Sequence, residues 1–240
     1  MSHRLRTGLC VLLACLFGLP ALAREPRYTV ISVDPNTQTL GLYLRDERDR
    51  PLHSFARLDR WLAERKQTLR YAMNAGMYEP DYSPVGLLVA DGKELAPLNL
   101  REGEGNFYLK PNGVFLLSDS GARVIESSRY PDISAGVRLA TQSGPLLLQD
   151  GKIHPKFDPQ SKSRHIRNGV AVKDGEVLLV ISDTPVNLYE FAAYFRDELH
   201  CRDALYLDGT VSGLYAPELR RKGSGAKLGP MFGVIGSNPQ

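Results

Sequence analysis

The chain has 240 residues and a mass of 26.6 kDa, and 42% of its residues are hydrophobic and 24% charged. This composition is near the globular average, so it excludes a wholly disordered chain, a coiled coil and a collagen-like fibre. The formal charge of +3 is small. A dedicated nucleic-acid binder usually has a much larger basic excess, so no nucleic-acid partner is expected.

The first residues have the pattern of a secretory signal peptide. Two arginines precede a short apolar run, and a cleavage site of the A-x-A type ends at Ala23. We expect removal of residues 1–23 and an exported mature chain, 24–240, that is periplasmic or secreted and has no transmembrane span. Lipoprotein anchoring at Cys15 is the alternative, but the residues after Cys15 stay apolar, which disfavours it.

The predicted cleavage also bears on charge and on thiol chemistry. Residues 1–23 contain two arginines and no acidic residue, so the mature charge falls from +3 to +1. Cys10 and Cys15 are removed as well, and Cys201 remains as a single thiol that has no intramolecular disulfide partner. Cys201 follows a predicted helix end, where a buried thiol is the expected role and a catalytic thiol the alternative.

Most of the mature chain has a period-two hydrophobic pattern, interrupted by turn signals. Asp-Gly and Asn-Gly pairs predict hairpins, and a turn at 34–36 predicts that the first two strands pair with each other. The predicted strands are 27–33, 40–44, 71–73, 85–90, 93–95, 106–110, 114–117, 123–126, 146–149, 152–154, 170–173, 177–181, 205–207 and 232–235.

Two segments have the apolar spacing of helices. The first extends from Leu58 to Leu69, and the second from Leu188 to Leu199, with Asn187 as its N-cap. Repeated hairpins imply mainly antiparallel pairing. We therefore predict one α+β domain over 24–240, with a mixed, mainly antiparallel sheet and two main helices.

Polar residues beside glycines at predicted strand ends are candidate site residues, because a rigid strand aims the side chain and glycine lets a ligand approach the backbone. They are Asn74, Gln142, Ser143, Arg167, Asn168, Asp183 and Asp208. Each could instead be a turn residue, since Asn, Asp and Gly also form turns. Asp208 is the hardest to explain in this way, because an apolar strand leads directly into it and Gly209 follows.

Other kinds of site have little support. The histidines lack the spacing of a zinc site, and no serine lies in a G-x-S-x-G motif. A hydrolase that depends on Ser143 or Cys201 is an alternative that the sequence leaves open. Glu190 is either a catalytic carboxylate or only the partner of Asn187 in a capping box. No cofactor is expected, although clustered Asp and Asn oxygens could hold a divalent cation.

Five short motifs occur in the order that is typical of the phosphodiester glycosidase family. They are Asn74-Ala75-Gly76-Met77-Tyr78, Pro84-Val85-Gly86, Gln142-Ser143-Gly144-Pro145, Arg167-Asn168-Gly169-Val170 and Leu207-Asp208-Gly209. The chain resembles this family over residues 70–236, most of the mature chain. The family includes the mammalian enzyme that uncovers phosphorylated mannose by removing N-acetylglucosamine, and the chain is most similar to its small, exported bacterial branch.

The resemblance implies an α+β domain that hydrolyses a sugar-1-phosphodiester at the glycosidic bond and releases free sugar. The substrate would be a phosphate-containing glycan or a sugar phosphate. Asp208 would stabilise the oxocarbenium-like transition state, with Asp183 or Glu190 as a second carboxylate, and Arg167 would pair with phosphate oxygens. The implied substrate-binding residues are Asn74, Gly76, Gln142, Ser143, Gly144, Arg167, Asn168 and Gly209.

One departure from the family pattern affects the expected pocket. Many members continue the last motif as a run of glycines before a serine, whereas this chain has Thr210-Val211-Ser212. The bulkier residues stiffen the backbone and reshape any pocket beside it. A catalytically silent module that binds carbohydrate or cell envelope on the same fold is therefore the alternative function.

Overall fold

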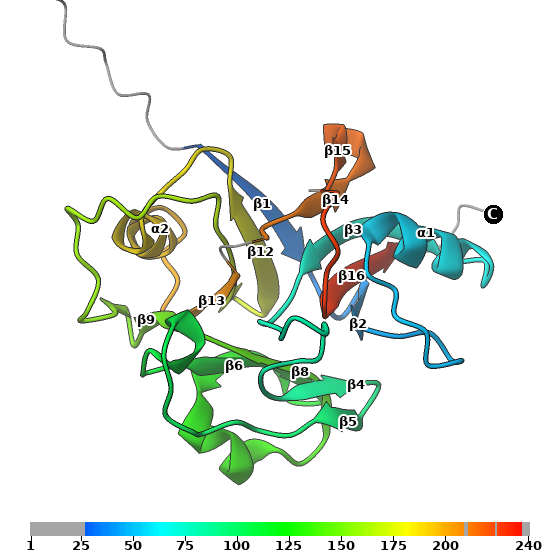
Figure 1. Cartoon of the computed structure of the whole chain (residues 1–240), viewed down its shortest axis with the longest axis horizontal. Helices are drawn as coiled ribbons and strands as arrows, with labels where there is room; N and C mark the ends of the chain where they lie inside the picture. Colours follow the sequence, from blue (N-terminus) through cyan, green and yellow to red (C-terminus); the bar gives the residue numbers. More distant parts are fainter. Residues whose placement is uncertain (1–26, 209–210, 224, 237–240) are drawn as a thin grey trace, which may run out of the picture.

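The computed structural model describes residues 27–208, 211–223 and 225–236 (Figure 1). The predicted signal peptide, Gly209 and Thr210 lie outside the described residues. The strands form three sheets, and every strand pair among the described residues is antiparallel. The prediction of one α+β domain with mainly antiparallel pairing and two main helices is confirmed, although three sheets replace the expected single one.

The first sheet has six strands in the order β1-β12-β11-β13-β9-β10. Their bounds are β1 Tyr28–Val33, β9 Leu146–Gln149, β10 Lys152–Ile153, β11 Asn168–Lys173, β12 Glu176–Ser182 and β13 Ala204–Asp208. Helix α2 (Leu188–Ala193) continues into a π-helical turn, η3 (Tyr194–Glu198), and covers the outer face of this sheet with Phe191 and Phe195.

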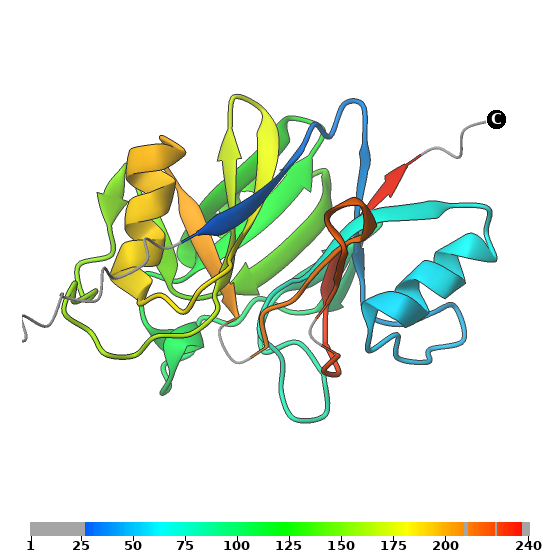
Figure 2. The same ribbon diagram turned by 90° about the horizontal axis from the view of Figure 1, so that it is seen from above.

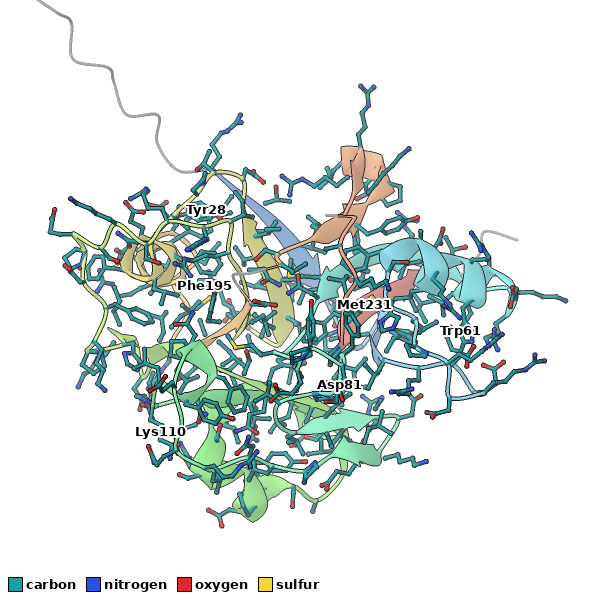
Figure 3. The ribbon with its side chains drawn as sticks, viewed as in Figure 1. Tyr28, Trp61, Asp81, Lys110, Phe195 and Met231 are labelled. Carbon is teal, nitrogen blue, oxygen red and sulfur yellow. The ribbon has the colours of Figure 1, made fainter. Side chains whose placement is uncertain are left out.

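The second sheet has five strands in the order β15-β14-β3-β16-β2. Their bounds are β2 Thr39–Tyr43, β3 Thr68–Asn74, β14 Leu214–Ala216, β15 Arg221–Lys222 and β16 Met231–Gly236. Helix α1 (Phe55–Ala63) packs on its outer face through Leu58 and Leu62, and a short helix, η4 (Pro217–Leu219), separates β14 from β15. Figure 3 shows Trp61 on the opposite side of the molecule from Phe195, with Met231 nearer the middle.

The third sheet has five strands in the order β5-β4-β8-β6-β7. Their bounds are β4 Leu88–Ala90, β5 Lys93–Ala96, β6 Gly113–Ser118, β7 Gly121–Glu126 and β8 Val137–Ser143. Two 3-10 helices flank it, η1 (Asn106–Tyr108) and η2 (Ser127–Ile133), and Tyr130 of η2 packs on its outer face.

Inner side chains of all three sheets form one central core. Leu207 comes from the first sheet, Phe232 from the second and Phe115 from the third. The rings of Phe115 and Phe232 meet edge to face, with centroids 5.4 Å apart. The sheets therefore surround a shared core, and α2, α1 and η2 cover their outer faces. No helix among the described residues is long and apolar enough to cross a membrane.

Several expectations about single elements were wrong. The turn at 34–36 forms, but β1 pairs with β12 and β2 with β16, so the two strands belong to different sheets. The segment expected as a strand over 106–110 contains η1 instead, because only Phe107 of its apolar residues is directed into the core. Helix α1 ends at Ala63, since Lys66 has left-handed backbone and the chain then enters β3, to which Leu69 belongs.

Candidate active site

Strand ends from all three sheets meet at one point. Asn74 ends β3 of the second sheet, and Ser143 ends β8 of the third. Asn168 begins β11, and Asp208 ends β13, its neighbour in the first sheet. Asn168 and Asp208 lie directly opposite each other in the ladder. The polar strand ends that the sequence singled out are therefore brought together in space.

Asn168 is the centre of the hydrogen bonds that hold this meeting point. Its Oδ1 accepts from the backbone N–H of Asp208 (3.1 Å), and its Nδ2 donates to the carbonyl of Asn74 (3.0 Å). Ser143 Oγ donates to the carbonyl of Leu207 (2.7 Å). Asn74, Ser143 and Asn168 are fully buried. These three side chains fix the end of β13, and with it the position of Asp208.

The chain beyond Asp208 is fastened to the same centre. The backbone N–H of Gly213 donates to Asn74 Oδ1 (2.9 Å). Ser212 Oγ donates to the carbonyl of Asp208 (2.5 Å) and lies 3.2 Å from Asn168 Oδ1. The segment that leads into β14 is therefore held by the two asparagines that also hold β13.

Two of the predicted glycines allow the sheets to approach closely. A Cβ at Gly76 would lie 2.3 Å from the carbonyl oxygen of Gln142, whereas the Gly76 N–H donates to Thr141 Oγ1 (3.1 Å). A Cβ at Gly144 would lie 2.6 Å from the carbonyl oxygen of Phe107. Gly76 therefore joins the second sheet to the third, and Gly144 lets η1 pack against the end of β8.

Gln142 points away from this meeting point. Its Oε1 accepts from the backbone N–H groups of Leu87 and Asn99, and its Nε2 donates to the carbonyl of Asn99. Successive side chains on a strand face opposite sides, so Ser143 faces β13 while Gln142 is buried in the third sheet. The side chain of Gln142 therefore orders the 85–99 segment.

Two adjoining cavities meet at Asp208. The first, which we call the arginine lobe, has a volume of 380 Å³. It is lined by Met77, Asn106, Ser163, His165, Arg167, Tyr206 and Asp208. Of the candidate site residues from the sequence, Arg167 and Asp208 line this lobe, and Asn74 and Ser143 lie buried beside Asp208. Tyr206 and Asp208 are two residues apart on β13, so they share a face of the strand.

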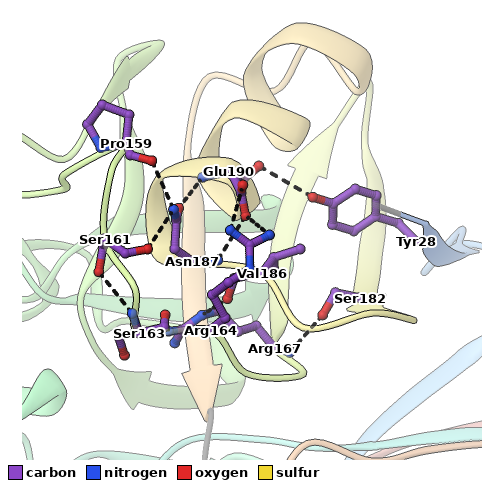
Figure 4. Close-up of polar contacts among 10 residues, drawn as sticks. All are labelled: Tyr28, Pro159, Ser161, Ser163, Arg164, Arg167, Ser182, Val186, Asn187 and Glu190. Carbon is purple, nitrogen blue, oxygen red and sulfur yellow. Dashed lines mark hydrogen bonds and ion pairs between the residues drawn. The ribbon is translucent and has the colours of Figure 1, made fainter. Parts of the chain in front are cut away.

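Arg167 is 2% exposed and is held by backbone and hydroxyl oxygens; Figure 4 shows it beside Val186 and Ser163. Its Nε donates to the carbonyl of Val186 (2.8 Å), one Nη to Tyr206 Oη (2.9 Å) and the other Nη to the carbonyl of Ser163 (2.9 Å). These bonds use three of its five N–H groups. Among the described residues no carboxylate forms an ion pair with Arg167, although the carboxylate of Asp208 lines the same lobe. The buried guanidinium is therefore held by neutral oxygen acceptors alone.

The second cavity, which we call the aromatic lobe, has a volume of 440 Å³ and shares Met77, Asn106 and Asp208 with the arginine lobe. The rest of its lining includes Tyr78, Val85, Phe107, Tyr108 and Val211. Tyr78 lies in the loop between β3 and β4, which protrudes beside the segment that precedes β16 (Figure 2). Asp208 therefore lies where a cationic cavity meets an aromatic one.

The carboxylate of Asp208 affects two phenols nearby. Burial raises the pKa of Tyr206 to about 12, and the charge of Asp208 adds to this rise while Arg167 opposes it. Burial and, after it, the charge of Asp208 raise the pKa of Tyr78 to about 12. Both phenols therefore keep their protons at neutral pH and remain hydrogen-bond donors beside the cavities.

The other two predicted carboxylates line neither lobe. Glu190 completes the capping box of α2 with Asn187 and forms an ion pair with Arg164 (2.8 Å) (Figure 4). Asp183 accepts from Thr29 Oγ1 (3.1 Å) and is paired with Arg221. A catalytic role for Glu190 or Asp183 stays a prediction, and the placement of their side chains does not favour it.

The Glu190→Ala variant is expected to lose stability but to keep its activity. Alanine removes half of the capping box and the partner of Arg164, so the free energy of unfolding should fall by about 1–2 kcal/mol. Turnover should change by less than about threefold, because Glu190 lines neither lobe. Thermal denaturation and a turnover assay check both parts. A Glu190→Ala protein that folds stably but has no activity would indicate that Glu190 is a catalytic carboxylate.

Cys201 and Ser143, the alternative nucleophiles, are both buried. Burial raises the pKa of the Cys201 thiol to about 11, and Ser143 Oγ is bonded to the carbonyl of Leu207. In a chain that begins at residue 24, Cys201 should therefore resist iodoacetamide at pH 8 until the protein unfolds. Mass spectrometry of native and denatured samples measures this. Rapid alkylation of the native protein would reopen a thiol mechanism.

Four residues of the arginine lobe, Asn106, Ser163, His165 and Tyr206, were not predicted from the sequence as site residues. Tyr206 and Asn106 looked like parts of apolar strands, and His165 had no partner at motif spacing. The period of β13, which puts Tyr206 on the face of Asp208, is the one signal that could have found Tyr206. In the part of the chain that the structure describes, no three His, Cys, Asp or Glu side chains gather in the manner of a metal site.

Comparison with known proteins identifies the relatives of the chain. A family model described as phosphodiester glycosidase matches residues 67–234. The Escherichia coli (strain K12) protein YigE, described as uncharacterized, is 33% identical over 218 residues, which cover 88% of this chain and 84% of YigE.

Two solved structures have a similar fold. The catalytic domain of zebrafish N-acetylglucosamine-1-phosphodiester alpha-N-acetylglucosaminidase, auto-inhibited by its pro-peptide, superposes with a TM-score of 0.59 at 13% identity over 88% of this chain and 82% of that one. A Burkholderia pseudomallei protein described as exported superposes with a TM-score of 0.51 at 12% identity, over 86% of this chain and 73% of that one. At these identities the likeness concerns the fold alone.

Proposed function

Because the chain belongs to the phosphodiester glycosidase family, we propose that it is a hydrolase that cleaves the glycosidic bond of a sugar-1-phosphodiester or a related glycan. The observation that carries this proposal is the position of Asp208 beside Arg167, where the two lobes meet. A carboxylate suits the positive charge that develops at an anomeric carbon, and a buried guanidinium suits a phosphate.

In the proposed reaction, water adds to the anomeric carbon and the bond from this carbon to the phosphate oxygen breaks. The bonding electron pair leaves on the phosphate, and the proton that water loses passes to solvent. The products are free sugar and a phosphate monoester. Asp208 stabilises the oxocarbenium-like transition state, and Arg167 stabilises the charge that builds on the leaving phosphate.

Arg167 can bind an anion through the N–H groups that make no bond within the protein. Tyr206, Val186 and Ser163 hold the guanidinium by three bonds, which leaves one N–H on each Nη for phosphate oxygens. A fork held in this way loses little freedom when the anion binds. A bound phosphate would also give buried Arg167 an ion-pair partner, which no carboxylate among the described residues supplies.

We assign the buried members of the predicted site to positioning. Asn74, Ser143 and Asn168 hold the end of β13, and their bonds within the protein leave Asp208 and Arg167 as the residues that meet the substrate. Gly76 lets the second and third sheets approach, and Gly144 lets η1 pack against the end of β8. Gly209 stays a proposed substrate-binding residue on sequence grounds.

We propose that the mature protein is residues 24–240, exported to the periplasm or secreted. The charged, then apolar, pattern of residues 1–23 supports this, and the similar Burkholderia protein is described as exported. Export would give the protein access to phosphate-containing glycans of the cell envelope.

A binding module without activity is the second candidate. Val211, which occupies a position that is glycine in many relatives, lines the aromatic lobe and narrows it. A narrowed lobe could hold a sugar without permitting the approach of water to its anomeric carbon.

Turnover decides between the two candidates. The purified protein is assayed for release of phosphate monoester from a panel of sugar-1-phosphodiesters, with and without chelator. The hydrolase proposal expects turnover on at least one diester. Binding of a diester without its hydrolysis would favour the silent module, and loss of turnover with chelator would add a divalent cation.

A further inference from the structure

The two lobes differ in charge. The arginine lobe contains Arg167 and His165, whereas no lysine, arginine or histidine lies among the described residues of the aromatic lobe. That lobe contains Glu79 and Glu104, both exposed, in addition to the shared Asp208. A phosphate would meet only negative side chains there, so a substrate with one charged end and one neutral end has a single favourable direction.

Two tyrosines of the aromatic lobe are built into fixed positions. The Tyr78 ring lies on Gly229, where a Cβ would come within 2.5 Å of it, and its hydroxyl donates to the carbonyl of Lys227 (3.1 Å). The Tyr108 ring lies on Gly103, where a Cβ would come within 2.7 Å, and packs edge to face on Phe107 with centroids 5.0 Å apart. Each ring is thus seated on a glycine, which limits its motion.

We infer that the aromatic lobe is the specificity pocket for the sugar of the substrate, that it selects a neutral sugar, and that Tyr78 and Tyr108 are its determinants. This inference rests on the proposed function. The apolar C–H face of a sugar ring packs on tyrosine, whose polar edge also offers a hydrogen-bond partner. Glu79 and Glu104 accept hydrogen bonds from sugar hydroxyls and repel sugars that carry a carboxylate.

The volume of the aromatic lobe agrees with this assignment. The lobe of 440 Å³ lies within the range of about 300–1,000 Å³ that is usual for small-molecule sites. A sugar held there has its anomeric carbon at the boundary between the lobes, beside Asp208, and its phosphate beside Arg167. Only this direction places both ends of the scissile bond against the side chains that stabilise their charges.

Binding of the two halves of the substrate tests the inference separately. The full chain is titrated by NMR with methyl glycosides of neutral hexoses and N-acetylhexosamines, with the matching uronic acid glycosides, and with inorganic phosphate. We expect Tyr108→Ala to weaken binding of the neutral glycosides at least tenfold and to change phosphate binding less than twofold. Tyr108→Phe should retain glycoside binding, as should the control Tyr189→Ala on helix α2.

A second variant avoids any disturbance of the packing around Tyr108. In this double variant, Glu79→Gln is combined with Glu104→Gln, and both residues are exposed, so the protein should fold normally. Its preference for neutral over uronic glycosides should be at least threefold smaller. Any of three results would overturn the inference: glycoside binding that Tyr108→Ala leaves unchanged, no preference for neutral sugars, or no glycoside binding at all. Glycoside binding without turnover of any diester would instead sink the proposed hydrolysis and leave the sugar pocket standing.

Discussion

The Asp208→Asn variant is expected to lose at least about 10³-fold in kcat for hydrolysis of a sugar-1-phosphodiester. Asparagine has nearly the same shape but lacks the charge that stabilises the oxocarbenium-like transition state. Since the backbone N–H of Asp208 makes the bond to Asn168, the end of β13 should keep its position. KM should change little, because the lost interaction belongs to the transition state.

Asp203→Asn is the matched control, because Asp203 immediately precedes the same strand at its other end and lines neither lobe. Its kcat should stay within about twofold of the unaltered protein. Release of phosphate monoester measures both variants. An Asp208→Asn protein with nearly full kcat would remove Asp208 from the chemistry.

Replacement of Arg167 by lysine should lower kcat/KM for the diester about 10²-fold, since lysine cannot present a planar fork to two phosphate oxygens. The same change should weaken binding of inorganic phosphate. It should also lower the free energy of unfolding by about 2–3 kcal/mol, because a lysine cannot satisfy Val186, Ser163 and Tyr206 together.

The stability loss needs to be separated from the loss of binding. The control is Arg196→Lys on η3, where half-buried Arg196 pairs with exposed Asp197. This change should leave both stability and kcat/KM nearly unchanged. The assay of Arg167→Lys is made well below its melting temperature. Unchanged phosphate affinity in folded Arg167→Lys would show that the guanidinium is structural.

Local patterns were sufficient where neighbouring residues determine the structure. Asp91-Gly92, Asp150-Gly151 and Asp174-Gly175 lie in the turns of hairpins that form as predicted. Asn187 caps α2 through the predicted capping box with Glu190. Each of these features depends on contacts within a few residues, which the sequence displays directly.

Strand β8 was missed because its polar residues have partners far along the chain. Thr141 accepts from Gly76, Gln142 bonds to Asn99, and Ser143 bonds to Leu207. All three are buried, so the strand lacks the alternation of polar and apolar residues that marks a half-exposed strand. Their hydrogen bonds, which make the burial tolerable, become visible only in the fold.

The same reason limits what the sequence says about the site. Asn74, Ser143, Arg167 and Asp208 were all predicted from the sequence as candidate site residues, and the three sheets bring their strand ends to one point. Which of them reach a cavity depends on side-chain direction and burial, so the division into lining and buried residues could not be predicted. The aromatic lobe depends on η1, which the apolar pattern of 106–110 misidentified as a strand.

The most direct test of the proposed function is the position of bond cleavage. A sugar-1-phosphodiester that the protein turns over is hydrolysed in water enriched in ¹⁸O, and both products are weighed by mass spectrometry. Cleavage between the anomeric carbon and oxygen, as proposed, places the label in the sugar and none in the phosphate monoester. Label in the phosphate monoester would mean that water attacks phosphorus, and the protein would then be a phosphodiesterase in which Asp208 stabilises no oxocarbenium ion.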